Sequence, residues 1–273
     1  MNKRFFVLLI CFYSFLQTAW ASKVDTVVTY SPSMKKEIKA VVITPDNYSP
    51  SQKYPVVYLL HGYSGNYAGW SRAKAVLASA DSYGQIVVCA DGAYGSWYWD
   101  SPKDPSFKYE TYVAKELVAW VDKKYATIQG PQGRAIAGLS MGGHGALYLA
   151  IKHPDVFGAT GSMSGGVDIR PFPNNWDMAK RLGSYAENAD LWEKNTVINM
   201  LHLIKPKTLS IIIDCGTEDF FYEVNQALHQ QLLYRNIQHD YIVRPGGHTW
   251  PYWENAVAYQ LLFFHQFFNQ KKS

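Results

Sequence analysis

Short apolar runs that end in turn residues recur along the chain with the spacing of an alternating α/β protein. The run at residues 55–60 ends at His61-Gly62, and the later runs also end at turns that contain glycine. Continuous apolar runs of this length are typical of strands buried on both faces of a parallel sheet. We expect strands at residues 24–30, 38–43, 55–60, 86–90, 134–137, 209–213 and 241–244.

Helical spacing fills the gaps between these runs. Tyr109, Val113 and Leu117 lie four positions apart, and a similar apolar spacing recurs near the end of the chain. This periodicity predicts helices that each bury one face. We expect helices at residues 109–121, 145–152, 224–232 and 257–268. The sequence thus predicts an α/β fold with a mostly parallel central sheet, helices on both faces, and a ligand site at the carboxyl ends of the strands.

One segment interrupts the alternation. Residues 166–206 contain Pro171, Pro173 and two adjacent asparagines, followed by mixed helical patches. We interpret this segment as a short helical insertion over the site, because a chain of 273 residues allows one large α/β domain and requires no second one. The predicted domain spans residues 22–273.

The first 21 residues have the pattern of a cleavable signal peptide. Lys3 and Arg4 give a cationic start, residues 5–16 are almost entirely apolar, and residues 19–21 place small side chains where a signal peptidase reads them. We expect cleavage after Ala21 and a secreted or periplasmic protein without stable membrane insertion. A retained N-terminal anchor is the alternative, although the run is shorter than the roughly 20 apolar residues that spanning needs.

The amino-acid composition excludes some protein classes and some kinds of binding partner. The chain is 48% hydrophobic and 18% charged, which excludes a disordered tail or a fibrous repeat. It carries 26 Lys and Arg against 22 Asp and Glu without a basic block, so we expect no nucleic-acid partner. The 9 Trp and 20 Tyr favour a cleft for rings or sugars, with core packing as the alternative. Cys89 and Cys215 are expected to be buried free thiols.

The most specific motif lies directly after the strand at residues 134–137. Gly138-Leu-Ser-Met-Gly142 fits G-x-S-x-G between a strand and a helical run, where the sharp turn presents the Ser140 hydroxyl at the sheet edge. The amide of Met141, at the positive end of the following helix, points toward the position of an oxyanion. A chance match in a glycine-rich turn is the alternative. A phosphate or dinucleotide loop is excluded, because neither glycine pattern is present.

A serine nucleophile needs an imidazole base and a carboxylate that orients it. Of the eight histidines, His248 alone lies in a loop between a strand and the last helix, so we expect it to be the base. His61 is expected to matter through its backbone, and His144 through packing. The remaining histidines are expected to lie at the surface or to pack. No pair of histidines has metal-ligand spacing, so we expect neither a metal nor a cofactor.

Residues 214–219 offer three carboxylates at the end of a strand. Asp219 is the favoured acid, since it lies on the loop beyond the glycine, where its side chain can turn back toward the base. Asp214 is expected to support the loop and Glu218 to face solvent. The chain order Ser, Asp, His is that of the G-x-S-x-G hydrolases.

From Tyr54 onward the chain resembles the family of α/β-hydrolases known as putative esterases, which includes esterase D (S-formylglutathione hydrolase), tributyrin esterases, feruloyl and acetyl xylan esterases, and mycolyltransferases. This resemblance implies hydrolysis of esters or thioesters, or acyl transfer. It also implies Asp219 as the acid and an oxyanion hole formed by the amides of Met141 and Tyr63. The matching motifs are Leu59-Leu-His-Gly62, Trp97-Tyr98, Tyr109-Glu-Thr-Tyr112, Gly138 to Gly143, His153-Pro154, Met163-Ser-Gly165, Asp214 to Asp219 and Gly247-His-Thr-Trp250.

Differences between this sequence and members of the family that it resembles narrow the range of candidate substrates. Esterase D is normally cytosolic, whereas this chain has an export pattern, and nothing in the sequence specifies a groove for a long acyl chain. We expect an exported serine esterase that acts on acetyl or feruloyl esters of carbohydrates. An acyltransferase, a thioesterase of the S-formylglutathione hydrolase type and a silent glycan-binding hydrolase fold remain alternatives, and the oligomeric state is open. Candidate substrate-binding residues are Trp97, Tyr98, Trp176 and Trp250.

Overall fold

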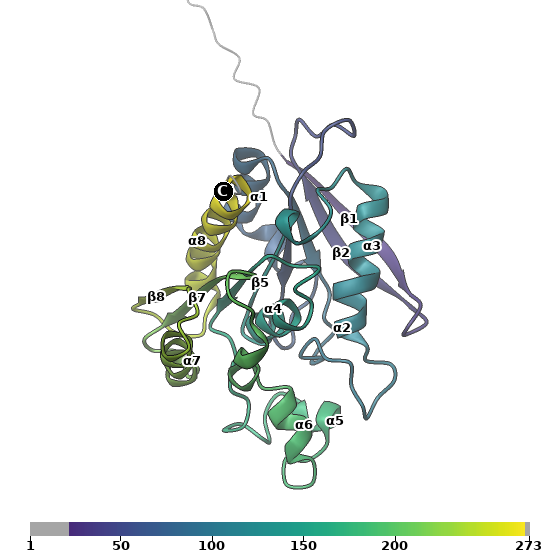
Figure 1. Cartoon of the computed structure of the whole chain (residues 1–273). Coiled ribbons are helices and arrows are strands. Elements are labelled where there is room, and N and C mark those ends of the chain that lie inside the picture. The colour runs from purple at the N-terminus through teal and green to yellow at the C-terminus, as the bar shows by residue number, and fades with distance from the viewer. Residues whose placement is uncertain (1–21, 271–273) are drawn as a thin grey trace, which may run out of the picture.

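The computed structural model describes residues 22–270, which form an eight-stranded sheet flanked by helices (Figure 1). The order of the strands across the sheet is β1-β2-β4-β3-β5-β6-β7-β8. Their bounds are β1 (Lys23–Ser31), β2 (Lys36–Thr44), β3 (Val56–Leu60), β4 (Ile86–Ala90), β5 (Arg134–Leu139), β6 (Ala159–Met163), β7 (Ser210–Gly216) and β8 (Asp240–Arg244).

Most neighbouring strands run parallel. β1 pairs antiparallel with β2, and β2 pairs antiparallel with β4, whereas the pairs from β4 through β8 are all parallel. The carboxyl ends of β3 to β8 therefore meet at one edge of the sheet. This arrangement confirms the mostly parallel sheet that the buried apolar runs predict. β6, which no apolar run predicts, lies between the two predicted strands β5 and β7.

Between residues 22 and 270, eight helices and several shorter turns connect or follow these strands. A π-helical segment, η2 (Tyr112–Leu117), joins α2 to α3 as one continuous rod, and η1 (Trp70–Arg72) is a 3₁₀ turn ahead of α1. Their bounds are α1 (Lys74–Tyr83), α2 (Tyr109–Thr111), α3 (Val118–Lys124), α4 (Met141–Lys152), α5 (Met178–Leu182), α6 (Ala189–Lys194), α7 (Tyr222–Tyr234) and α8 (Trp250–Asn269), with further 3₁₀ turns η3 (Pro131–Gly133), η4 (Val197–Asn199) and η5 (Leu201–Leu203).

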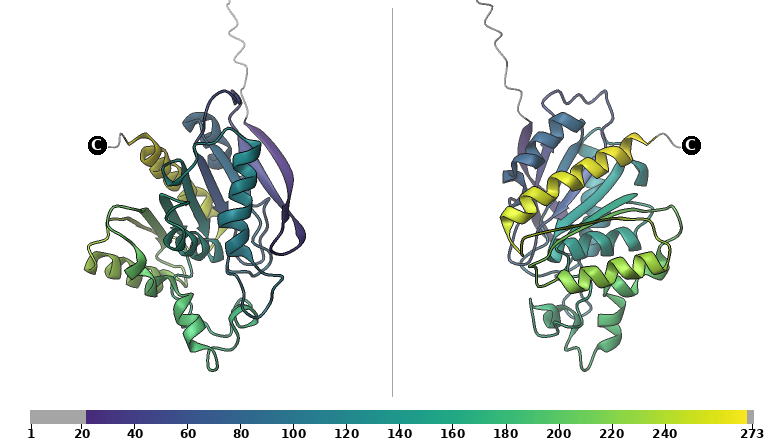
Figure 2. Two further views of the ribbon diagram at one scale, coloured as in Figure 1. Left: turned by 45° about the vertical axis from the view of Figure 1, so that its right-hand side comes forward. Right: turned by 90° about the vertical axis from the view of Figure 1, so that its left-hand side faces the viewer.

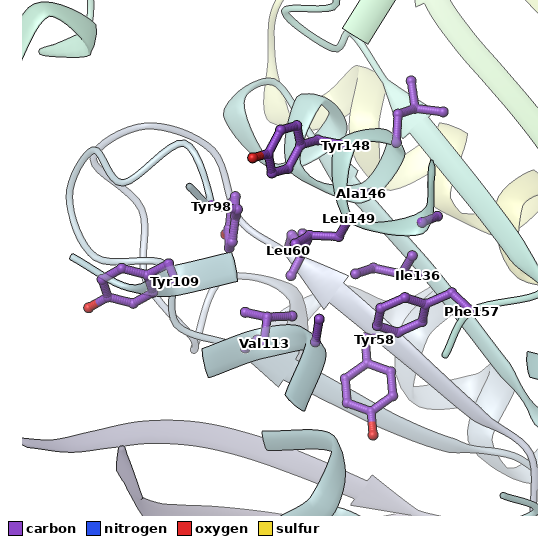
Figure 3. Close-up of a cluster of buried hydrophobic side chains, with 14 of the residues drawn as sticks. Tyr58, Leu60, Tyr98, Tyr109, Val113, Ile136, Ala146, Tyr148, Leu149 and Phe157 are labelled. Carbon is purple, nitrogen blue, oxygen red and sulfur yellow. The ribbon is translucent and has the colours of Figure 1, made fainter. Parts of the chain in front are cut away.

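The helices cover both faces of the sheet and form two apolar cores. On one face α8 lies across the strands beside α1, where Val257, Leu261 and Phe264 are fully or almost fully buried (Figure 2). On the other face the α2–α3 rod, α4 and α7 pack against the sheet, and Figure 3 shows buried side chains of this second core, including Tyr58 and Phe157. Because β3 to β6 are covered on both faces, the elements around the β5–α4 turn are rigidly placed.

The segment between β6 and β7 contains α5, α6 and two 3₁₀ turns, and its helices project beyond one end of the sheet (Figure 1). Among residues 22–270 no helix combines the length and the apolar character that crossing a bilayer requires. Cys89 and Cys215 are both free and buried, as expected. The predicted signal peptide at residues 1–21 lies outside the described residues.

Candidate active site

Ser140 lies in the tight turn between β5 and α4. Its φ of 56° and ψ of −118° belong to a region that side-chain-bearing residues rarely adopt. The flanking glycines permit this turn: a Cβ on Gly138 would lie 2.4 Å from the backbone of Gly142, and a Cβ on Gly142 would lie 2.4 Å from the carbonyl oxygen of Leu60. The motif therefore requires glycine at both positions because the backbone of neighbouring elements fills the space.

His248, on the loop between β8 and α8, contacts both other residues of the predicted set. Its Nε2 is 2.9 Å from Ser140 Oγ, and its Nδ1 is 2.8 Å and 3.0 Å from the two carboxylate oxygens of Asp219. Asp219 is buried and also accepts a hydrogen bond of 2.8 Å from the backbone N–H of Phe221. Side chains from three separate loops thus form one hydrogen-bonded line.

The donors and acceptors in this line have a defined order. In the neutral imidazole, the Nδ1 of His248 carries the proton, because the Asp219 carboxylate can only accept a hydrogen bond. The lone pair on Nε2 then faces Ser140 Oγ and can accept the hydroxyl proton. This arrangement can make a serine oxygen nucleophilic at neutral pH.

Aromatic rings hold the His248 imidazole from two sides. The Phe220 ring lies 4.2 Å away, centroid to centroid, and the Trp253 ring meets the imidazole edge-on at 4.8 Å. Trp253 is itself fixed by a hydrogen bond of 3.0 Å from its Nε1 to Ser164 Oγ. These contacts restrict the rotation of the imidazole away from Ser140.

Two backbone amides, one directly after Ser140 and one in a loop that lines the same cavity, have no acceptor among the described residues. Met141 is the first residue of α4, and Tyr63 follows Gly62, whose added Cβ would lie 3.2 Å from Ser140 Cβ. The His61 ring is occupied: its Nδ1 donates to the carbonyl oxygen of Gly62 at 2.7 Å, and its Nε2 accepts from the N–H of Gly92 at 2.8 Å. The loop therefore presents its backbone near Ser140, while the His61 ring holds the loop.

A cavity of about 740 Å³ opens above Ser140 and His248. Arg72 and Glu254, both exposed, supply charged groups at this site, and neither forms an ion pair among the described residues. Five aromatic side chains line the cavity: Tyr63, Trp176, Phe220, Trp250 and Trp253. Within residues 22–270 no group of three or more His, Cys, Asp or Glu side chains is placed to hold a metal ion.

Comparison with known proteins identifies the family. A family model described as "Putative esterase" matches residues 31–264. The chain belongs to this esterase family. It is therefore a carboxylic ester hydrolase by family, and its sheet and helices form the α/β-hydrolase fold that solved esterases share.

Three proteins illustrate the similarity of this esterase to known ones. An acetyl esterase of Caldicellulosiruptor saccharolyticus is 26% identical over 250 residues, which cover 84% of this chain and 93% of that protein. An esterase of Mycobacterium tuberculosis (strain CDC 1551 / Oshkosh) is 28% identical over 239 residues, 76% of this chain but only 52% of that longer protein. A solved ferulic acid esterase has a TM-score of 0.79 at 28% identity, covering 92% of this chain and 100% of that chain.

Two of the expected substrate-binding residues of this esterase do not reach the cavity. Trp97 and Tyr98 are 1% and 0% exposed and are absent from the cavity lining. The hydroxyl of Tyr98 donates to the carbonyl oxygen of His61, and its ring fills the space beside Gly145. Contrary to the expectation that they bind substrate, both rings pack beneath the loops of the site, outside the cavity. Trp176 and Trp250 do line the cavity.

Phe220 also belongs to the site, although the sequence pattern did not single it out. It follows Asp219, is 52% exposed, and stacks on Trp176 at 5.6 Å with an interplanar angle of 19°. The signal in the sequence is the position of Phe220, directly after the predicted acid on a loop at the carboxyl ends of the strands, where the ligand site is expected.

The other carboxylates of the 214–219 turn have different surroundings. Asp214 is fully buried, accepts one hydrogen bond from the Tyr252 hydroxyl and pairs with Arg244, and burial raises its pKa above the ordinary value. Glu218 is exposed. Asp219 is thus the carboxylate of this turn that faces His248.

Proposed function

We propose that this protein is a serine esterase that works through a covalent acyl-enzyme. The single observation that carries the proposal is the hydrogen-bonded line from Ser140 through His248 to Asp219, with distances of 2.9 Å and 2.8 Å. The same geometry is what nucleophilic serine catalysis needs: a hydroxyl, a base within hydrogen-bond reach and a buried carboxylate that orients the base.

In the first half of the reaction, Ser140 Oγ attacks the ester carbonyl as its proton passes to His248 Nε2. The carbonyl oxygen becomes an oxyanion, and the free amides of Met141 and Tyr63 donate to it. The imidazolium then protonates the leaving alcohol, and the acyl group remains on Ser140. Asp219 holds the Nδ1 proton and stabilises the charge on the imidazole throughout.

In the second half, His248 takes a proton from water, and the resulting oxygen nucleophile attacks the acyl-enzyme carbonyl. The tetrahedral intermediate collapses, the carboxylic acid leaves, and Ser140 regains its proton from His248. The rings of Phe220 and Trp253, which pack against His248, keep the imidazole between the serine and the carboxylate through both halves of the reaction.

For the substrate we propose acetyl or feruloyl esters of carbohydrates. The cavity supports this choice, since flat aromatic faces such as Trp250, which is 44% exposed, suit sugar and phenolic rings. Arg72, Glu254 and Asn66 add polar groups that can bond hydroxyls. The acetyl esterase and the ferulic acid esterase to which this chain is similar support the choice of acyl group by their names. With residues 1–21 as a signal peptide, the enzyme would meet such substrates outside the cytoplasm.

The substrate proposal is tested with a panel of esters on the mature chain, residues 22–273. The panel holds acetylated xylose, feruloylated arabinose, p-nitrophenyl acetate, p-nitrophenyl decanoate and S-formylglutathione. We expect kcat/KM for a sugar ester to exceed that for the decanoate and the thioester by at least about tenfold, the size of effect that a few pocket contacts give. A preference for the decanoate or the thioester contradicts the proposal, and Ser140→Ala serves as the blank.

A further inference from the structure

The segment between β6 and β7 reaches the site through two adjacent residues with unusual backbone geometry. Trp176 and Asp177 have φ values of 49° and 58°, and neither is glycine. The left-handed region is unfavourable for residues with a side chain, so surrounding contacts must hold both residues there. Trp176 lines the cavity and Asp177 follows it directly, so the backbone is constrained where this segment meets the site.

Contacts on both residues tie this turn to the core of the site. The backbone carbonyl of Trp176 accepts a hydrogen bond of 3.1 Å from Trp97 Nε1, and its ring stacks on Phe220. The carboxylate of Asp177 accepts a hydrogen bond of 3.2 Å from the Tyr63 hydroxyl and pairs with Lys180 at 2.9 Å through its other oxygen. Asp177 does not line the cavity, so it does not reach the substrate.

Tyr63 is the residue whose amide the proposed mechanism assigns to the oxyanion hole, and it lines the same cavity as Ser140. Its side chain is held at the far end by Asp177 and edge-on by the Tyr94 ring at 4.8 Å, while the next residue, Ser64, donates its N–H to the carbonyl oxygen of Tyr94 at 2.8 Å. Burial, together with the neighbouring Asp177 carboxylate, raises the pKa of Tyr63 to about 12, so the hydroxyl stays a donor. Fixing both the backbone and the ring leaves this residue little freedom to rotate.

We propose that Asp177 is a positioning residue for catalysis: through the Tyr63 hydroxyl it holds the Tyr63 amide in the direction of the oxyanion. The inference rests on the proposed function, because it assigns Tyr63 a role in the oxyanion hole. A donor that points correctly before the reaction stabilises the transition state without reorganisation. The insertion therefore contributes to turnover as well as to the wall of the cavity.

The test removes the hydroxyl bond from either end and leaves the amide in place. Tyr63→Phe and Asp177→Ala are each expected to lower kcat by roughly fivefold, with KM within about twofold, because the lost bond acts in the transition state. The double variant is expected to lose no more than either single one. Asp177→Asn keeps an acceptor oxygen and is expected to recover most of kcat. Lys180→Met, which removes only the other partner of Asp177, is the matched control and is expected to keep normal kcat.

A transition-state mimic separates positioning from support of the fold. With an aryl trifluoromethyl ketone, the Ser140 oxygen bonds to the ketone carbon, the ketone oxygen becomes an oxyanion, and the serine proton moves to His248. Its affinity is expected to fall with kcat in Tyr63→Phe, whereas a matched carboxamide that forms no adduct is expected to bind unchanged.

Three results overturn the inference: an unchanged kcat in both single variants, losses that add in the double variant, or equal losses for the ketone and the carboxamide. Unfolding curves in urea check that each variant is folded. Failure of the proposed function is seen separately, as activity that survives in Ser140→Ala.

Discussion

Two buried carboxylates on one turn, Asp214 and Asp219, differ in their hydrogen-bond partners. Asp214 pairs with Arg244 and accepts a hydrogen bond from Tyr252, so it is a structural group, and its burial raises its pKa against the effect of these partners. Asp219 accepts from the backbone of Phe221 and from His248 alone among the described side chains. These two residues lie five positions apart in the chain. Their different partners indicate that Asp214 supports the loop and that Asp219 orients the base.

Exchanging each carboxylate for an amide tests this division. Asp219→Asn is expected to lower kcat for p-nitrophenyl acetate by about 10³-fold or more, because the amide no longer fixes the imidazole tautomer. Asp214→Asn is expected to keep kcat within about tenfold but to lower the free energy of unfolding by roughly 3 kcal/mol, the cost of breaking a buried pair. Steady-state kinetics and urea unfolding measure the two effects. A folded Asp214→Asn that is the slower enzyme contradicts the assignment.

At the scale of the element, α4 carries the nucleophile turn at one end and is held by polar contacts along its length. His144 is fully buried: its Nδ1 donates to the carbonyl oxygen of Gly166 at 3.0 Å, and its Nε2 accepts from Trp99 Nε1 at 2.9 Å. Burial lowers the pKa of His144 to about 4. At the far end of α4, Lys152 Nζ donates a hydrogen bond to the Glu110 carboxylate. Burial alone would raise the pKa of Glu110, but the hydrogen bonds from the end of α4 outweigh it and lower this pKa to about 2.

These shifts predict how stability depends on pH. His144 takes up a proton near pH 6.5 in the unfolded chain but only near pH 4 in the folded protein. As the pH is lowered from 6.5 to 4, the free energy of unfolding is therefore expected to fall by about 3 kcal/mol. Glu110 adds a second loss from pH 4.5 toward 2, since its folded pKa is the lower one.

Urea unfolding followed by tryptophan fluorescence between pH 7 and 4 measures the first step. His144→Gln, which keeps an acceptor for Trp99, is the comparison variant and is expected to show a smaller slope over this range. Equal slopes in the two proteins contradict the burial of an uncharged imidazole at this position.

At the scale of the whole molecule, continuous apolar runs made most of the sheet predictable, because strands covered on both faces need such runs. β6 escaped prediction, since it contains Thr160, Gly161 and Ser162; a Cβ on Gly161 would lie 1.8 Å from Gln260 Oε1 of α8. Close packing of two helices against the middle of the sheet favours small residues there, and their pattern resembles a loop.

The site was predictable to a similar degree. Ser140, His248 and Asp219 could be chosen because each follows a strand that ends at the same edge, and the structure places them within hydrogen-bond distance of one another. The burial of Trp97 and Tyr98 could not be predicted, because both have positive φ, 55° and 59°, a backbone conformation that residues with a side chain rarely adopt. Contacts across distant segments, such as Tyr63 with Asp177, also leave no local pattern in the sequence.

The central claim is that Ser140 is the nucleophile that His248 activates. Labelling with a fluorophosphonate tests it most directly, because such reagents bond to an activated serine oxygen. Intact mass and peptide mapping are expected to show one adduct, on Ser140, absent from Ser140→Ala and formed at least about 100-fold more slowly in His248→Ala. Ser64→Ala, which alters another serine that lines the same cavity, is the control and is expected to label normally. An adduct on a different residue, or an undiminished rate in His248→Ala, contradicts the claim.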